Sequence, residues 1–155
     1  MLILIRHGEK TDNDEINLSD KGYKRADEIA LYFSKQKNHN IKIPEIIIAM
    51  KQHDKKSSNR PYQTVHPLSK KLNLPIITDY TRDQIPELIN LLNSYKDKTV
   101  LICWEHEYLA KIASTLLNKP LNWGFNPNSG KDSDVYDPIW IIENNILNIY
   151  KQFEP

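Results

Sequence analysis

Short apolar runs alternate along the chain with segments in which apolar residues recur every three or four positions. The runs are rich in Ile, Leu and Val and have the length and composition typical of β-strands. Most are apolar throughout, as expected for strands that are buried on both faces of a sheet. We expect strands at 2–5, 46–50, 75–78, 99–104, 139–142 and 146–150.

The other segments carry apolar stripes with the period of an α-helix, so each stripe is expected to face a core. Ser19 suits the N-cap of the first helix, and Pro61 fits the first turn of the second, where its missing N–H is not needed. Asp83 or Gln84 is expected to cap the third. The stripes are Ala26, Ile29, Ala30 and Phe33; Val65, Leu68 and Leu72; Ile85, Leu88, Ile89 and Leu92; and Leu109, Ile112, Ala113 and Leu116.

Strands that alternate with helices are typical of α/β proteins, in which helices cover a mostly parallel sheet. We therefore predict a three-layer α/β/α sandwich with a mainly parallel central sheet. A chain of 155 residues has the usual length of one domain, so we expect a single domain over residues 1–155. Segments 51–59 and 122–138 are polar and irregular, and the second is long enough to be a functional loop beside a site.

The composition restricts the partners and the compartment. The formal net charge is +1, so no overall field attracts the protein to nucleic acid or to an anionic membrane. The single cysteine, Cys103, lies in an apolar run and fits a reducing compartment. The apolar run at 2–5 is too short for a signal-peptide core, and no stretch approaches the roughly 18 residues that span a bilayer. We expect a cytoplasmic protein with no nucleic-acid or membrane partner, and its oligomeric state stays open.

Groups of residues that could form a polar site, two histidines and two arginines among them, follow three of the expected strands. In open α/β sheets, ligands bind beyond the carboxyl ends of the strands, where loops converge and helix N-termini offer unpaired N–H groups. We therefore expect these residues to share one site. They are Arg6, His7 and Gly8 after the first strand, Ser58 and Arg60 after the second, and Glu105, His106 and Glu107 after the fourth.

Such a set suits phosphoryl transfer. A neutral imidazole such as that of His7 is a good nucleophile near neutral pH, and neighbouring guanidinium groups disfavour its protonated form. The planar forks of Arg6 and Arg60 would hold the phosphoryl group and balance its charge in the transition state. His106 would donate to the same group, and Gly8 would let the backbone approach it closely. A cation such as Arg60 is unfavourable at a helix start unless an anion binds there.

Four segments of the sequence carry a resemblance to a known family. They are LIRHGE at 4–9, LSDKG at 18–22 with RA at 25–26, SSNRPYQT at 57–64, and VLICWEH at 100–106. Their order and content resemble the histidine phosphatase superfamily, also called phosphoglycerate-mutase-like, over nearly the whole chain. The resemblance implies that His7 is the nucleophile, that Arg6 and Arg60 bind phosphate, and that His106 polarises it. It also implies a reaction that needs no metal or other cofactor.

The sequence departs from this family where the general acid is expected. The family's acidic loop residue between the middle strands has no clear counterpart, and Glu107 follows the second histidine in place of a glycine, a small polar residue or an aspartate. Glu107 is therefore the candidate acid, with Asp83 and Glu9 as rivals. An acidic residue in the first turn of a helix is also favourable for the helix dipole alone. Ser58 either hydrogen-bonds phosphate or caps the following helix.

We expect a phosphatase that moves a phosphoryl group from a small phosphomonoester or a phosphoprotein to His7 and then to water. A phosphoglycerate-type mutase is an alternative, although so short a chain lacks room for the insertions that would close over a sugar-acid phosphate. A metal-dependent hydrolase using His7, His106 and a carboxylate is another, which the arginines disfavour because they would repel a cation. A non-catalytic anion-binding module of the same fold is the third.

Overall fold

The computed structural model describes residues 1–36, 40–53, 58–124, 127–131 and 134–153. Every strand and helix expected from the sequence is present, and each strand begins and ends within one residue of the expected position. The strands are β1 (Leu2–Arg6), β2 (Ile46–Ala49), β3 (Ile76–Ile77), β4 (Val100–Trp104), β5 (Pro138–Glu143) and β6 (Ile146–Lys151). The helices are α1 (Asp20–Phe33), α2 (Arg60–Leu72), α3 (Ile85–Asn93) and α4 (His106–Leu117).

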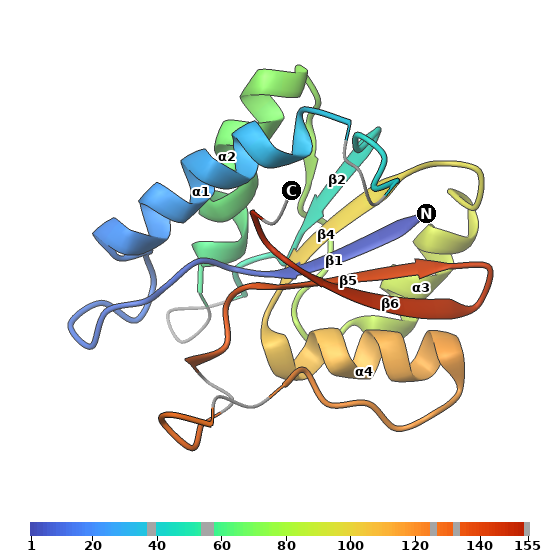
Figure 1. Cartoon of the computed structure of the whole chain (residues 1–155). Coiled ribbons are helices and arrows are strands. Elements are labelled where there is room, and N and C mark those ends of the chain that lie inside the picture. Colours follow the sequence, from blue (N-terminus) through green and yellow to red (C-terminus); the bar gives the residue numbers. More distant parts are fainter. Residues whose placement is uncertain (37–39, 54–57, 125–126, 132–133, 154–155) are drawn as a thin grey trace.

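All six strands form one sheet in the order β3-β2-β4-β1-β5-β6. Strands β3, β2, β4 and β1 are parallel, whereas β5 runs antiparallel to β1 and β6 antiparallel to β5. Helices α1 and α2 cover one face of the sheet, and α3 and α4 cover the other (Figure 1). The predicted three-layer sandwich with a mainly parallel sheet is therefore confirmed.

Strand β1 lies inside the sheet and is buried on both faces. Ile3 and Ile5 pack toward α1 and α2, while Leu4 packs toward α3 and α4, and none of the three has exposed surface. This two-sided burial explains why the strand is apolar throughout. Core packing thus holds in place the carboxyl end of β1, where Arg6 and His7 follow the apolar residues of the strand.

The antiparallel strands follow from a tight turn that the sequence pattern did not predict. Asn144 and Asn145 join β5 to β6 and have φ of 53° and 61°, which asparagine tolerates better than most residues in two-residue hairpin turns. Because β5 is antiparallel to β1, it begins at the edge of the sheet where β1 ends. The segment 134–137, which leads into β5, therefore lies at the carboxyl end of β1 (Figure 1).

The helix starts agree with the sequence. The Ser19 hydroxyl accepts a hydrogen bond from the N–H of Gly22, as an N-cap does, and Pro61 lies in the first turn of α2. Gln84, rather than Asp83, occupies the position before α3, but its side chain makes no capping hydrogen bond, so the expected cap of this helix is not formed. None of the helices in the described ranges has the length and apolar character needed to cross a membrane.

The first turn of α1 lies unusually close to the segment that follows β1. A Cβ atom on Gly22 would lie 2.4 Å from the carbonyl oxygen of Glu9, and one on Gly8 would lie 2.9 Å from the carbonyl oxygen of Gly22. Both partners are backbone atoms, which do not move aside cheaply. These glycines therefore set how closely α1 approaches residues 8–9.

Gly22→Ala should destabilise the protein by about 1–3 kcal/mol, the usual cost of overpacking. Urea unfolding followed by circular dichroism measures the change. Lys24→Ala, at an exposed position of the same helix, is the control and should leave stability nearly unchanged. Equal stability of the two variants would show that the close approach is not required.

Candidate functional site

The candidate site lies where β1 and β4 end side by side. Arg6 pairs with Trp104 in the parallel register, and the N–H of His7 donates to the Trp104 carbonyl oxygen at 3.2 Å. His7 thus lies beside Glu105, the residue that precedes α4. Arg60 begins α2 and His106 begins α4. The structure therefore brings the carboxyl ends of the strands and the starts of both helices together, as expected from the sequence.

The His7 ring is held in one orientation by the backbone of the next residue. Its Nδ1 lies 2.7 Å from the carbonyl oxygen of Gly8. Because a carbonyl oxygen only accepts, Nδ1 carries the proton and donates it in this bond. Nε2 is then the nitrogen with the free lone pair, which is the atom a nucleophilic imidazole needs.

His7 is uncharged across the physiological pH range. Its side chain is buried, and its pKa falls from 6.5 to about 3, chiefly because burial disfavours the charged form. Arg6 adds the next largest lowering effect, with smaller ones from Arg60 and His106, whereas the bond to Gly8 acts in the opposite direction. These effects place both arginines and the second histidine within electrostatic range of the ring.

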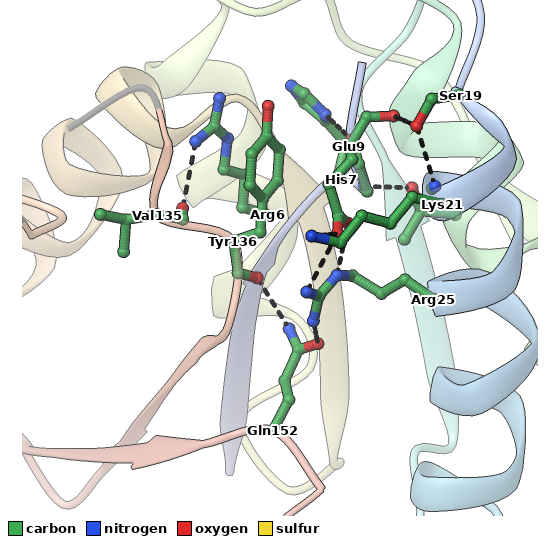
Figure 2. Close-up of polar contacts among 12 residues, drawn as sticks. Arg6, His7, Glu9, Ser19, Lys21, Arg25, Val135, Tyr136 and Gln152 are labelled. Carbon is green, nitrogen blue, oxygen red and sulfur yellow. Dashed lines mark hydrogen bonds and ion pairs between the residues drawn. The ribbon is translucent and has the colours of Figure 1, made fainter. Parts of the chain in front are cut away.

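Arg6 is buried and held by the segment that precedes β5. Its Nη1 donates to the Val135 carbonyl oxygen at 3.0 Å, and its guanidinium carbon lies 3.9 Å from the centre of the Tyr136 ring. The same ring meets His7 edge to face, with 6.2 Å between ring centres. Figure 2 shows the Tyr136 ring beside the Arg6 side chain. The irregular loop at 122–138 thus borders the candidate site, as expected.

The segment that holds Arg6 is itself fixed by a chain of polar contacts (Figure 2). The Gln152 side chain donates to the Tyr136 carbonyl oxygen at 3.2 Å and accepts from Arg25 at 2.8 Å. Arg25 in turn binds the Glu9 carboxylate through two bonds of 2.5 and 3.1 Å. Elements from both ends of the chain therefore determine where Arg6 lies.

Arg60 is held by backbone carbonyls of the segment before α1. Its Nε donates to the Asn17 carbonyl oxygen at 2.9 Å, and its Nη2 donates to that of Asp14 at 2.7 Å. The side chain of Asp14 is occupied elsewhere, because it accepts from the N–H groups of Ile16 and Asn17. Carbonyl oxygens orient a guanidinium group without neutralising its charge, so Arg60 keeps its positive charge beside His7.

Gly8 and Ser58 have structural contacts of their own. The N–H of Gly8 donates to the Thr64 hydroxyl at 2.8 Å, and that hydroxyl donates to the Arg60 carbonyl oxygen at 2.7 Å. The Ser58 hydroxyl accepts from the N–H of Arg60 at 2.9 Å, which satisfies a donor at the start of α2. A phosphate-binding role for either residue stays a prediction. Ser57, part of the same sequence segment, lies outside the described residues.

The candidate acids have different surroundings. Glu9 is hydrogen-bonded to Arg25. Asp83 is exposed, and its carboxylate accepts a hydrogen bond from the Thr81 hydroxyl at 3.0 Å. Glu107 is exposed in the first turn of α4. Glu105, which the sequence does not single out as an acid, is partly buried beside Arg82.

A cavity of about 840 Å³ opens between the N-terminal half of α4 and the loop that follows this helix. Its volume is in the range of small-molecule sites. Trp123 lies at its edge and packs against Trp140, with 4.9 Å between ring centres, while Phe125 lies outside the described residues. The lining residues are His106, Glu107, Ala110, Lys111, Leu121, Asn122, Trp123, Gly124, Gly130 and Lys131.

Potential metal ligands do not cluster in the parts of the chain that the structure describes. No group of three or more His, Cys, Asp or Glu side chains in these parts is arranged to hold a metal ion.

Comparison with known proteins identifies the fold. No protein-family model matches the sequence, and no curated protein matches it. Solved structures do match. The α-ribazole phosphatase of Shigella flexneri is 13% identical, with a TM-score of 0.65 over 99% of this chain and 96% of that one. A mycobacterial glucosyl-3-phosphoglycerate phosphatase in complex with VO3 is 15% identical, with a TM-score of 0.61 over 97% of this chain and 96% of that one.

A third match is a proposed phosphohistidine phosphatase, SixA, from Agrobacterium tumefaciens, which is 13% identical. Its TM-score is 0.59 over 99% of this chain and 97% of that one. All three are similar to this chain over almost their whole length. The chain therefore has the histidine phosphatase, or phosphoglycerate-mutase-like, fold that the sequence segments indicated.

The low pKa of His7 predicts that stability falls in acid. In the unfolded chain His7 binds a proton near pH 6.5, whereas in the folded chain it does so only near pH 3. The free energy of unfolding should therefore decrease as pH falls between these two values. The contribution of His7 to this slope is at most about 1.4 kcal/mol per pH unit.

Urea unfolding at several pH values measures this slope. His7→Gln should show a shallower dependence on pH than the unchanged protein, and His53→Gln, at an exposed histidine, should not. A His7→Gln variant with the original slope would mean that the folded protein protonates His7 normally.

Proposed function

We propose that this chain is a phosphatase in which Nε2 of His7 accepts a phosphoryl group and passes it to water. The observation that carries the proposal is the state of His7: a buried, neutral ring, oriented by Gly8 and within electrostatic range of Arg6, Arg60 and His106. A structural histidine at a strand end does not require two arginines beside it, and their charges are unfavourable there unless an anion binds.

The proposed reaction has two steps. First, the lone pair of Nε2 attacks phosphorus, an N–P bond forms, and the bond from phosphorus to the leaving oxygen breaks as that oxygen takes up a proton. Water then attacks the phosphohistidine, the N–P bond breaks, and the water proton goes to a nearby base as phosphate leaves. The Nδ1 proton stays on the ring, where the Gly8 carbonyl stabilises the positive charge that develops after attack.

The arginines support this chemistry through their placement. Carbonyl oxygens and an aromatic ring orient Arg6 and Arg60, so both keep their charge for a phosphoryl group. His106 at the start of α4 would donate to the same group, together with the N-terminal end of the helix. Preorganised cations of this kind are the main source of catalysis in phosphoryl transfer.

The cavity beside His106 favours a small phosphomonoester as the substrate, because it has room for an organic leaving group. Two of the similar structures are phosphatases named for small organic molecules, glucosyl-3-phosphoglycerate and α-ribazole, which supports the same class. A phosphoprotein is the second candidate, supported by the likeness to the proposed phosphohistidine phosphatase SixA. We place this activity in the cytoplasm, in keeping with a single, reduced cysteine that is buried.

Replacing His7 with Ala should reduce hydrolysis of an aryl phosphate by about a thousandfold or more, because no other group replaces the nucleophile. Rapid quenching with radiolabelled substrate should trap acid-labile label on the unchanged protein and none on His7→Ala. His53→Ala is the matched control and should behave like the unchanged protein.

Three outcomes, one of them from a parallel assay in EDTA, would contradict the proposal. Activity retained in His7→Ala would exclude His7 as the nucleophile. Loss of activity in EDTA, restored by a divalent metal, would favour the metal-dependent hydrolase. Labelled protein that never turns over would favour the non-catalytic module.

Arg60→Lys should weaken inhibition by vanadate, because an ammonium group cannot reproduce the planar fork of arginine. The expected loss is about tenfold to a hundredfold, the value of one charged hydrogen bond. Lys70→Arg, a charge-preserving change in the last turn of the same helix, controls for general effects on α2. Equal inhibition of Arg60→Lys and the unchanged protein would remove Arg60 from the site.

A further inference from the structure

We infer that Glu105 is the general acid of this site, donating a proton to the leaving oxygen when the phosphoryl group moves to His7. The inference rests on the proposed function and names the residue that this function requires. It differs from the acid expected from the sequence, Glu107, and from the two rivals, Asp83 and Glu9.

The position of Glu105 follows from the sheet. Because β1 and β4 are parallel and in register up to Arg6 and Trp104, the next residues, His7 and Glu105, lie side by side beyond the sheet. Glu105 is also the N-cap residue of α4, directly before His106. Of the candidate acids, Glu105 is the one that lies next to His7, directly after the neighbouring strand.

The Glu105 carboxylate lies among charged groups from four parts of the fold. Arg82, from the loop before α3, is its ion-pair partner, with 3.9 Å between Nη1 and Oε2. The Trp104 indole fixes this loop by donating to the Arg82 carbonyl oxygen at 3.1 Å. Arg60 from α2, Arg6 from β1 and Glu107 from α4 also act on the carboxylate. Glu105 therefore shares the electrostatic surroundings of the arginines that we assign to phosphate.

These surroundings favour the protonated form. Burial raises the pKa of Glu105 above its usual value, and Glu107 raises it further, against the lowering effects of Arg82, Arg60 and Arg6. A bound phosphate dianion would neutralise Arg6 and Arg60 and so favour proton uptake by Glu105. Substrate binding would thereby favour the protonated form of Glu105 that the reaction needs.

The rivals are less suited to this role. The carboxylate of Glu9 forms an ion pair with Arg25, and Asp83 is exposed. Glu107 is exposed on the first turn of α4. Neither of these two exposed carboxyl groups is partly enclosed by the fold as that of Glu105 is.

The proton transfer balances over the two steps. The Glu105 carboxyl gives its proton to the leaving oxygen as the P–O bond breaks, and becomes a carboxylate. It then takes a proton from the water that attacks phosphohistidine, which returns it to the acid form when phosphate is released.

Two aryl phosphates with different leaving groups test the inference. Phenolate is as basic as the tyrosine side chain, with a pKa near 10, and needs a proton to leave. Nitrophenolate is a much weaker base and leaves without one. For Glu105→Gln, kcat/KM for phenyl phosphate should fall about a hundredfold or more, while that for p-nitrophenyl phosphate should change only a few-fold. Glu107→Gln is the matched control and should affect both substrates alike.

A second variant tests the same group without removing it. Arg82→Met takes away the ion-pair partner, so the pKa of Glu105 should rise and the high-pH decline of kcat/KM for phenyl phosphate should move to higher pH. An equal loss on both substrates in Glu105→Gln, or a pH profile that stays in place in Arg82→Met, would overturn the inference. An unchanged protein inactive on both aryl phosphates would instead contradict the proposed function.

Discussion

The hydrogen bond between the His7 ring and the Gly8 carbonyl is the interaction on which this site depends, because it decides which ring nitrogen keeps its lone pair. It requires the backbone at Gly8 to hold one position. The Thr64 hydroxyl binds the N–H of Gly8, and the contact with Gly22 leaves no room for a side chain at either glycine. The packing between α1, α2 and the end of β1 thereby determines which tautomer His7 adopts.

The positive charges around His7 impose a second constraint. Burying guanidinium groups is expensive unless their N–H groups are satisfied, and here backbone carbonyls bind both Arg6 and Arg60. Carboxylate partners would have cancelled the charge that an incoming phosphoryl group needs. Glu9, the buried carboxylate nearby in sequence, instead binds Arg25 and helps to fix the segment that holds Arg6. Stability and anion binding are thus assigned to different arginines.

The sequence predicted the parts of this structure that local patterns encode. Apolar runs gave the strands, the hydroxyl of Ser19 marked the start of α1, and the residues that follow β1, β2 and β4 indicated where the site lies. The contact of Tyr136 with Arg6 links positions 130 residues apart in the chain, and the spacing of apolar residues does not predict contacts over such a separation. The sequence favours Glu107 over Glu105 as the acid, because the environment of a carboxyl group depends on which distant residues fold against it and no local pattern encodes this. The turn at Asn144 and Asn145 was also not predicted, although two successive asparagines between apolar runs are typical of a two-residue hairpin turn.

Nitrogen NMR of the protein with ¹⁵N-labelled histidine tests the central claim most directly, because it reports the protonation of each ring nitrogen. For His7 we expect a protonated Nδ1 and an unprotonated Nε2 that do not change between pH 5 and pH 8, as the pKa of about 3 requires. His7→Asn identifies the signal. A His7 ring that carries its proton on Nε2, or that becomes charged within this range, would contradict the account, since Nε2 would then have no lone pair with which to attack phosphorus.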